Sequence, residues 1–213
     1  IDRCLTDLEY GSSTGKLRSV LLLFNIATLL ENEKSNLRFP FDSFKIENWD
    51  IEHIRSVESD RPDRPDTQKA WLEGVKQCYE NTGEHAFLRG KIDKVIESKP
   101  FDKQGFDEIY AEIIDSSGEA ASSEADHRLE NLTLLDQGTN RSYKNAVFPV
   151  KRHRILSLDK SGIFVPLCTR NVFLKCYSTD LDKMEQWRDV DKSAYRKQVL
   201  DVLCSFFQPK SKS

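Results

Sequence analysis

Asn131-Leu132-Thr133-Leu134-Leu135 begins the stretch that decides the fold, and Asp136-Gln137-Gly138-Thr139-Asn140-Arg141-Ser142-Tyr143-Lys144-Asn145 completes it. The apolar run at its start predicts a short β-strand, and the glycine-containing segment that follows predicts a loop. Asparagine is a poor residue for strand and helix interiors, yet three asparagines fall within this one stretch. Turn chemistry explains any one of them. Their close grouping needs a further explanation.

A second stretch, Trp49-Asp50-Ile51-Glu52-His53-Ile54, places a carboxylate beside an imidazole at the end of an apolar segment. Alternating apolar residues from Phe44 onward predict a short strand that ends near His53, although Asn48 is also compatible with a turn. A histidine at a strand end is more often a hydrogen-bonded core residue than a catalyst. Together, however, the two stretches supply a proton acceptor, oxygen ligands for a hard cation and positive charge for phosphate, which phosphodiester hydrolysis requires.

The rest of the chain is predicted to be mostly helical. Apolar residues at helical spacing predict helices over 16–31, 67–81, 84–97, 101–114, 149–158, 170–177 and 191–207. Thr169 is expected to cap the helix over 170–177. A proline-containing loop at 58–66, three of these helices and a flexible, serine-rich connection at 115–126 form a helical insertion, about 58–126, between the two stretches.

Composition restricts the classes of protein that this chain can belong to. It has 213 residues, 38% of them hydrophobic, and a formal net charge of −3, so any binding to nucleic acid must depend on a local basic patch. The five cysteines form no CxxC pair, which favours reduced thiols in a cytoplasmic protein over a zinc site. No signal peptide or membrane-length apolar run is visible, so we expect a soluble protein. The absence of a starting methionine suggests a fragment of a longer chain.

The two stretches resemble the HNH (ββα-metal) nuclease superfamily. In that pattern an acidic residue and a histidine end the first strand, an asparagine begins the second strand, and another asparagine opens a helix. Here Glu52-His53, Asn131 and Asn140 match in type, order and spacing. The variant is closest to the C-terminal nuclease domain of GmrSD-type (type IV, modification-dependent) restriction endonucleases. The close likeness covers 49–54 and 127–155, and a looser one covers 16–41 and 162–207.

The resemblance implies a fold and a reaction. The fold is mainly α with a small embedded ββα-metal motif, an α+β arrangement in which residues 1–213 form one nuclease domain. His53 would be the general base that takes a proton from the attacking water. Asn131 would hold the loop that orients His53, and His127 would lie at the rim of the site.

The resemblance also implies a divalent cation, Mg²⁺ or Mn²⁺, because the ligands are oxygen atoms. Glu52 and Asn140 would bind it, and Asn145 would be either a further ligand or a helix cap. Glu52 stands where the family usually has an aspartate, and its longer side chain makes the ligand assignment less direct. Asp50, two residues earlier on the strand, is an alternative ligand.

Five cations lie within or shortly after the asparagine-containing stretch: Arg141, Lys144, Lys151, Arg152 and Arg154. Such a run usually marks a solvated helix face, but beside a phosphate site it predicts contacts with the backbone of DNA. The resemblance implies an endonuclease or nickase for double-stranded and possibly modified DNA, of the kind that defends against phage.

The resemblance places a nucleotide-hydrolysing domain N-terminal to this region in the full-length protein, and no glycine-rich phosphate loop occurs in this chain. Two alternatives stay open. One is a catalytically inactive module that binds nucleic acid or docks a partner. This alternative is favoured by the presence of Glu52 where the family usually has an aspartate. The other is cleavage of RNA.

Overall fold

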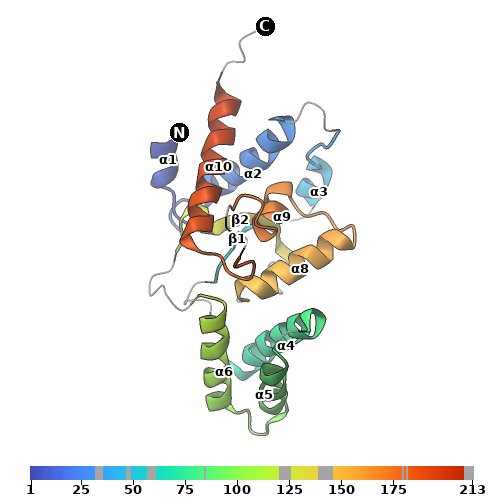
Figure 1. Cartoon of the computed structure of the whole chain (residues 1–213). Helices are drawn as coiled ribbons and strands as arrows, with labels where there is room; N and C mark the ends of the chain where they lie inside the picture. Colours follow the sequence, from blue (N-terminus) through green and yellow to red (C-terminus); the bar gives the residue numbers. More distant parts are fainter. Residues whose placement is uncertain are drawn as a thin grey trace.

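The computed structural model describes residues 1–31, 36–46, 49–56, 61–83, 85–119, 126–138, 146–178, 180 and 182–208. Within these residues the protein is mainly helical, with nine α-helices, a short 3₁₀ helix and one two-stranded antiparallel sheet (Figure 1). The bounds are α1 Asp2–Thr6, α2 Thr14–Glu31, α3 Phe41–Ile46, β1 Trp49–His53, α4 Pro65–Thr82, α5 Ala86–Glu97, α6 Lys103–Ser116, η2 Leu129–Asn131, β2 Leu132–Asp136, α8 Phe148–Lys160, α9 Leu167–Phe173 and α10 Asp189–Phe207.

The sheet joins the two stretches that the sequence singles out. β1 and β2 pair antiparallel, with Trp49 opposite Asp136, Glu52 opposite Thr133 and His53 opposite Leu132. The predicted end of the first strand at His53 is confirmed. Helices α4 to α6 lie between the two strands in the chain, so the pairing is a long-range contact that loop-closure entropy opposes. Packing of apolar residues around the sheet must offset that cost.

The predicted beginning of the first strand is wrong. Residues 41–46 form helix α3, and β1 begins only at Trp49. Pro40 directly precedes α3, and its carbonyl accepts the first hydrogen bond of the helix from the amide of Phe44 (3.0 Å). The alternation from Phe44 is therefore helical packing: the Phe44 ring stacks on Trp49 with ring centroids 5.8 Å apart, while Ile46 is 83% exposed.

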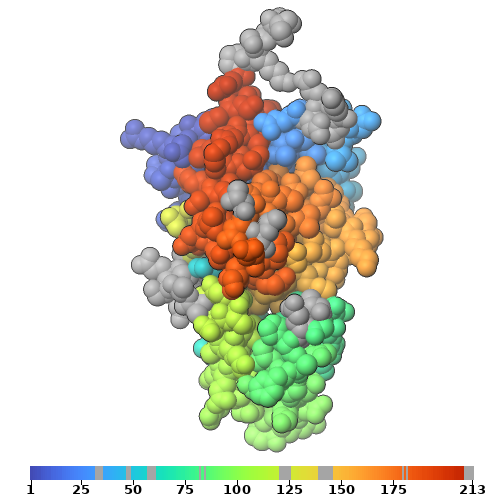
Figure 2. All heavy atoms as spheres, in the orientation of Figure 1, coloured from blue at the N-terminus to red at the C-terminus, as the bar shows by residue number. Residues whose placement is uncertain are grey.

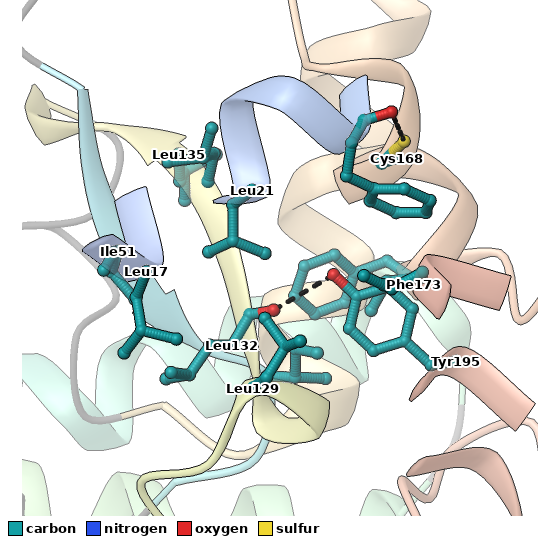
Figure 3. Packing of buried hydrophobic residues seen from close by; sticks show 14 of the residues in the cluster. Leu17, Leu21, Ile51, Leu129, Leu132, Leu135, Cys168, Phe173 and Tyr195 are labelled. Carbon is teal, nitrogen blue, oxygen red and sulfur yellow. Dashed lines mark hydrogen bonds between the residues drawn. The ribbon is translucent and has the colours of Figure 1, made fainter. Parts of the chain in front are cut away.

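One hydrophobic cluster surrounds the sheet and draws on α2, α8, α9 and α10. Figure 3 shows Leu21 of α2, Leu132 of β2 and Tyr195 of α10 together in this cluster. The hydroxyl of Tyr195 donates to the carbonyl of Leu132 (3.1 Å), so the buried phenol has a partner at the start of β2. The core helix expected over 16–31 is thereby confirmed as α2, which begins at Thr14.

Helix α9 begins earlier than the sequence indicates. It spans Leu167–Phe173, so Thr169 lies inside the helix and is not its N-cap. The Thr169 hydroxyl donates instead to the carbonyl of Leu134 in β2 (2.5 Å). The N-terminal amide of Cys168 is satisfied by the side chain of Asn25, which is buried in the middle of α2. A tertiary contact thus replaces the local cap that was expected.

A second hydrophobic cluster holds α4, α5 and α6 together at one end of the molecule (Figures 1 and 2). The three predicted helices of the insertion are present, and α4 begins at Pro65, which occupies its first turn. Helix α8 belongs to both clusters. Val147 and Val150 at its start pack with the insertion, whereas Phe148, Ile155 and Leu158 pack around the sheet. The insertion is therefore attached to the sheet region through α8.

Among the described residues, no helix combines the length and the apolar character needed to cross a bilayer.

Candidate active site

The pairing of β1 with β2 brings the candidate base and the first asparagine of the long stretch together. The amide of Ile54 donates to the carbonyl of Asn131 (2.8 Å). The amide of Arg55 donates to Asn131 Oδ1 (2.9 Å), and Asn131 Nδ2 donates to the carbonyl of Arg55 (3.1 Å). The side chain of Asn131 is completely buried. The Asn131 side chain therefore both accepts from and donates to the backbone of Arg55, as the backbone of a paired strand would.

Asn131 also holds the segment that precedes β2. A second bond from its Nδ2 goes to the carbonyl of Asp126 (3.0 Å), next to His127. One amide thus connects the chain after His53 with the chain before His127. This is the geometry that the expected positioning role of Asn131 requires, because replacing the amide would leave buried backbone groups without partners.

The imidazole of His53 lies against two other rings. His53 Nε2 and His127 Nδ1 are 3.0 Å apart, a hydrogen bond between two histidines 74 positions apart in the chain. The Tyr10 ring meets the His53 ring edge to face, with centroids 5.1 Å apart. His127, placed at the rim of the site by the sequence, is a direct partner of the candidate base.

Glu52 and Lys151 form a buried ion pair beside His53. Lys151 Nζ is 2.6 Å from Glu52 Oε1, and the two side chains are only 3% and 5% exposed. The same ammonium donates to the main-chain carbonyl of His53 (2.7 Å). Lys151 is therefore not the surface cation that its place in a basic run suggests. Its position on α8 turns it toward β1, because the flanking residues Val150 and Ile155 belong to the core.

Glu119 is a buried carboxyl group near this pair that the sequence did not single out. Its Oε1 accepts from the amide of Phe148 at the start of α8 (2.7 Å). Burial raises the pKa of Glu119 to about 7, although the Phe148 amide and the charges of Lys151 and Arg55 act in the opposite direction. The residue lies in the 115–126 connection, which was expected to be flexible. The available signal was an acidic residue directly after Gly118, but nothing local showed that it would be buried.

Asp50, the alternative metal ligand, is paired elsewhere. Its Oδ1 is 3.1 Å from Arg18 of α2 and also accepts from the amide of Ile51 (2.8 Å). Asp50 thus ties β1 to α2 at the end of the strand remote from His53. This arrangement favours Glu52 over Asp50 as the carboxylate of the site.

The segment before His127 is held by charges. Lys192 of α10 is 2.8 Å from Asp126, and Arg128 is 3.3 Å from the same carboxylate. Burial alone would raise the pKa of Asp126, but the hydrogen bond from Lys192 and the charges of Lys192 and Arg128 prevail and lower it. Asp126 is therefore an ionised anchor for the residue next to His127.

Several predicted site residues lie outside the described part of the chain. They are Asn140, Asn145, Arg141 and Lys144. Of the other predicted DNA contacts, Arg152 is partly exposed and 3.3 Å from Glu185, and Arg154 is partly exposed as well. The structure thus brings together His53, Asn131 and Glu52, and it leaves Arg152 and Arg154 of α8 partly exposed.

A divalent cation would need ligands beyond those described. Glu52 has the carboxylate oxygens that Mg²⁺ and Mn²⁺ prefer. Lys151 already neutralises that carboxylate, however, and in the described part of the chain no three His, Cys, Asp or Glu side chains come close enough to hold an ion. Glu52 therefore fits as one ligand of a cation, and Asn140 and Asn145 are the further ligands that the resemblance implies.

Comparison with known proteins adds no relative. The chain matches no model of a protein family, no curated protein and no solved structure.

Proposed function

We propose that this chain is a metal-dependent DNA endonuclease or nickase with His53 as its general base and with the ββα-metal arrangement of the HNH superfamily. The observation that carries the proposal is the pairing of β1 with β2. It places an imidazole, a carboxylate and the clamping amide of Asn131 in one region, although Arg55 and Asn131 are 76 positions apart. These residue types match the resemblance that the two stretches have to that superfamily.

In the proposed reaction, His53 accepts a proton from water as the water attacks the scissile phosphorus. A positioned base of this kind contributes about 10²–10⁴-fold to the rate. The surroundings of His53 suit that task, because Lys151 holds its main-chain carbonyl and Asn131 holds the next residues. The ring is therefore attached to a fixed backbone.

Glu52, with Asn140 and Asn145, would hold the Mg²⁺ or Mn²⁺ ion. When bound, such an ion stabilises negative charge on the phosphate and on the departing oxygen. Lys151 limits how strongly Glu52 attracts a cation, because the ammonium already shares its oxygen Oε1. We therefore propose that the ion binds together with the phosphate of the substrate.

Arg152 and Arg154, together with Arg141 and Lys144, would contact the DNA backbone. Lys151 has no part in this contact because its side chain is buried. The resemblance further suggests the cutting part of a cytoplasmic phage-defence protein, with an NTPase domain supplied elsewhere in the full-length chain.

One observation favours a second candidate function. The buried pair between Glu52 and Lys151 neutralises the carboxylate without a metal, as expected of a silent scaffold that binds nucleic acid or docks a partner. The nuclease remains the better supported of the two, because a binding module needs no hydrogen-bonded pair of histidines beside this carboxylate.

Nicking of supercoiled plasmid in Mg²⁺ or Mn²⁺ tests the proposal. The wild type should cut, and His53→Ala should be slower by about 10²–10⁴-fold. His85→Ala is the matched control, because His85 is an exposed histidine on the α4–α5 connection. Equal cutting by the wild type and His53→Ala would remove His53 as the base. No cutting of DNA, modified DNA or RNA by the wild type would favour the binding module, and cutting of RNA alone would change the substrate.

A further inference from the structure

We propose that His127 is a positioning residue that sets the tautomer of His53, so that His53 carries its proton on Nε2 and its lone pair on Nδ1. The catalytic meaning of this inference rests on the proposed function, but the tautomer itself does not. The starting point is the distance of 3.0 Å between His53 Nε2 and His127 Nδ1. That distance requires one proton between the two nitrogens.

Two arrangements of the neutral pair satisfy the bond. In the first, His53 Nε2–H donates to His127 Nδ1, and both rings carry their proton on Nε2. In the second, His127 Nδ1–H donates to His53 Nε2, and both rings carry their proton on Nδ1. The Nε2–H tautomer is the more stable one for a free histidine side chain. In the first arrangement both rings have this more stable tautomer, and in the second neither ring has it. The first arrangement is therefore favoured.

The choice of tautomer decides what His53 can do. In the second arrangement Nδ1 is a donor and Nε2 is occupied as an acceptor, so neither nitrogen of the ring can take up a proton from water. In the first arrangement Nδ1 is an acceptor, whatever group it meets. A base at this position therefore works through Nδ1, with His127 holding the proton on the other side of the ring.

Hydrogen bonds and ion pairs fix the backbone on both sides of His127. The amide of Tyr10 donates to the carbonyl of His127 (2.9 Å), and Glu9 forms a β-bridge with Arg128. On the other side, Asp126 is fixed by Asn131 and Lys192. The backbone of His127 is thus bound from the α1–α2 connection, and its neighbour Asp126 is held from η2 and α10, which gives the His127 ring a defined position opposite His53.

The experiment is a long-range ¹H–¹⁵N correlation spectrum of the histidine rings, taken at about pH 8, where imidazoles are mostly neutral. The chain has only four histidines, so single substitutions assign every signal. In the wild type we expect His53 Nδ1 at the shift of an unprotonated ring nitrogen and Nε2 at that of a protonated one. His127→Phe keeps a ring but removes the acceptor, and the His53 signals should move to a mixture of tautomers. His127→Asn retains an acceptor oxygen near the place of Nδ1 and should restore the wild-type pattern.

His153→Phe is the matched control, because that histidine contacts Asn81 on the far side of α8 and should leave the His53 signals unchanged. A wild-type proton on His53 Nδ1 would overturn the inference. Unchanged His53 signals in a folded His127→Phe protein would overturn it as well.

Plasmid nicking supplies the second measurement. His127→Phe should lower kcat by about 10–100-fold with little change in KM, and His127→Asn should stay within about threefold of the wild type. Full kcat in His127→Phe would overturn the positioning role. If the wild type cuts no substrate, the proposed function fails, whereas the spectra still decide whether His127 sets the tautomer of His53.

Discussion

Two buried lysine–carboxylate pairs in this molecule have the same chemistry and different surroundings. Lys175 and Asp191 are 3.1 Å apart, completely buried, and belong to the connection between α9 and α10 and to the start of α10. Lys151 and Glu52 are 2.6 Å apart, nearly as buried, and join α8 to β1. We call them the core pair and the site pair. A buried ion pair is by itself weak evidence for stability, so the groups around each pair show what it does.

The core pair is saturated by local partners. Asp191 accepts from the hydroxyl of Ser178 (2.5 Å) and from the amide of Arg188 (2.8 Å), and Lys175 donates to the carbonyl of Lys183 (2.8 Å). All of these contacts lie within the connection between α9 and α10 or at the first turn of α10. In the site pair, by contrast, the ammonium also holds the main-chain carbonyl of the candidate base. The difference indicates that the core pair serves folding and that the site pair serves the position of His53.

The largest expected effect breaks the core pair. Asp191→Ala leaves the ammonium of Lys175 buried without its counter-charge and removes two hydrogen bonds, so the free energy of unfolding should fall by about 3–5 kcal/mol. Urea unfolding followed by circular dichroism measures this. Asp201→Ala is the control on the same helix, because Asp201 forms an exposed pair with Lys197 and should matter little. A loss below about 1 kcal/mol in Asp191→Ala would show that the core pair has no structural role.

The second prediction replaces each pair by apolar residues of similar size. Glu52→Leu with Lys151→Met, and Asp191→Leu with Lys175→Met, should both retain most of their stability, because removing a whole buried pair is often neutral. Their activities should differ. Plasmid nicking should fall by at least about 100-fold in the site-pair variant, equivalent to about 2.7 kcal/mol, and should change little in the core-pair variant. Equal activity of the two variants would remove the distinction between the pairs.

The third prediction concerns the extra carboxyl near the site pair. Burial raises the pKa of Glu119 to about 7, so the folded protein retains a proton that the unfolded chain releases near its model value of 4.5. This contribution to stability is complete below the unfolded pKa and is lost as the pH rises toward 7. Between these values the free energy of unfolding should fall by about 1–3 kcal/mol.

Glu119→Gln keeps an acceptor for the amide of Phe148 and has no proton to lose, so this part of the pH dependence should disappear. Unfolding curves across the pH range for the wild type and the variant isolate the effect from other groups. Glu112→Gln, at an exposed glutamate of α6, should leave the dependence as it is. The predicted sign would be contradicted if the free energy of unfolding of the wild type, relative to that of Glu119→Gln, rose between pH 4.5 and 7.

The smallest effect concerns Arg152 and Arg154, the partly exposed arginines near Lys151 on α8. Arg152→Gln and Arg154→Gln should each weaken DNA binding only severalfold, about 0.5–1 kcal/mol, and each should reduce the slope of log Kd against log salt by about one. Fluorescence anisotropy at several salt concentrations measures both quantities. Lys197→Gln on α10 is the control, since it removes an exposed cation remote from the site pair. An unchanged slope for both arginines would show that α8 does not contact DNA.

Much of the secondary structure could be predicted because the signals are local. The heavy apolar loading of 16–31 predicts α2, and the run Leu132–Leu135 predicts β2, which extends to Asp136. The errors fall where a tertiary partner replaces a local one. Thr169 has the character of a cap, but Asn25 from α2 takes that role and leaves Thr169 to bind β2. The aromatic segment near Phe44 alternates like a strand and forms a helix.

The candidate site divides in the same way. His53, Glu52 and Asn131 could be chosen from residue type, order and spacing. The roles of Lys151, Glu119 and His127 could not, because each depends on a partner from a distant segment. Lys151 meets the carbonyl of His53 98 positions away, and His127 meets the ring of His53 74 positions away. The residue pattern within one segment cannot show which residue of a distant segment will contact it.

By itself, the sequence determined where the longer helices lie, where β1 ends and which side chains are able to accept a proton or hold a cation. Those properties follow from periodicity and from the chemistry of neighbouring residues, which are present in any conformation of the chain. Only the tertiary structure decided that Lys151 turns inward to Glu52 and that His127 binds the ring of His53. Both outcomes depend on α8 packing into two hydrophobic clusters and on β1 pairing with β2, because burial and hydrogen-bond partners are properties of the folded molecule as a whole.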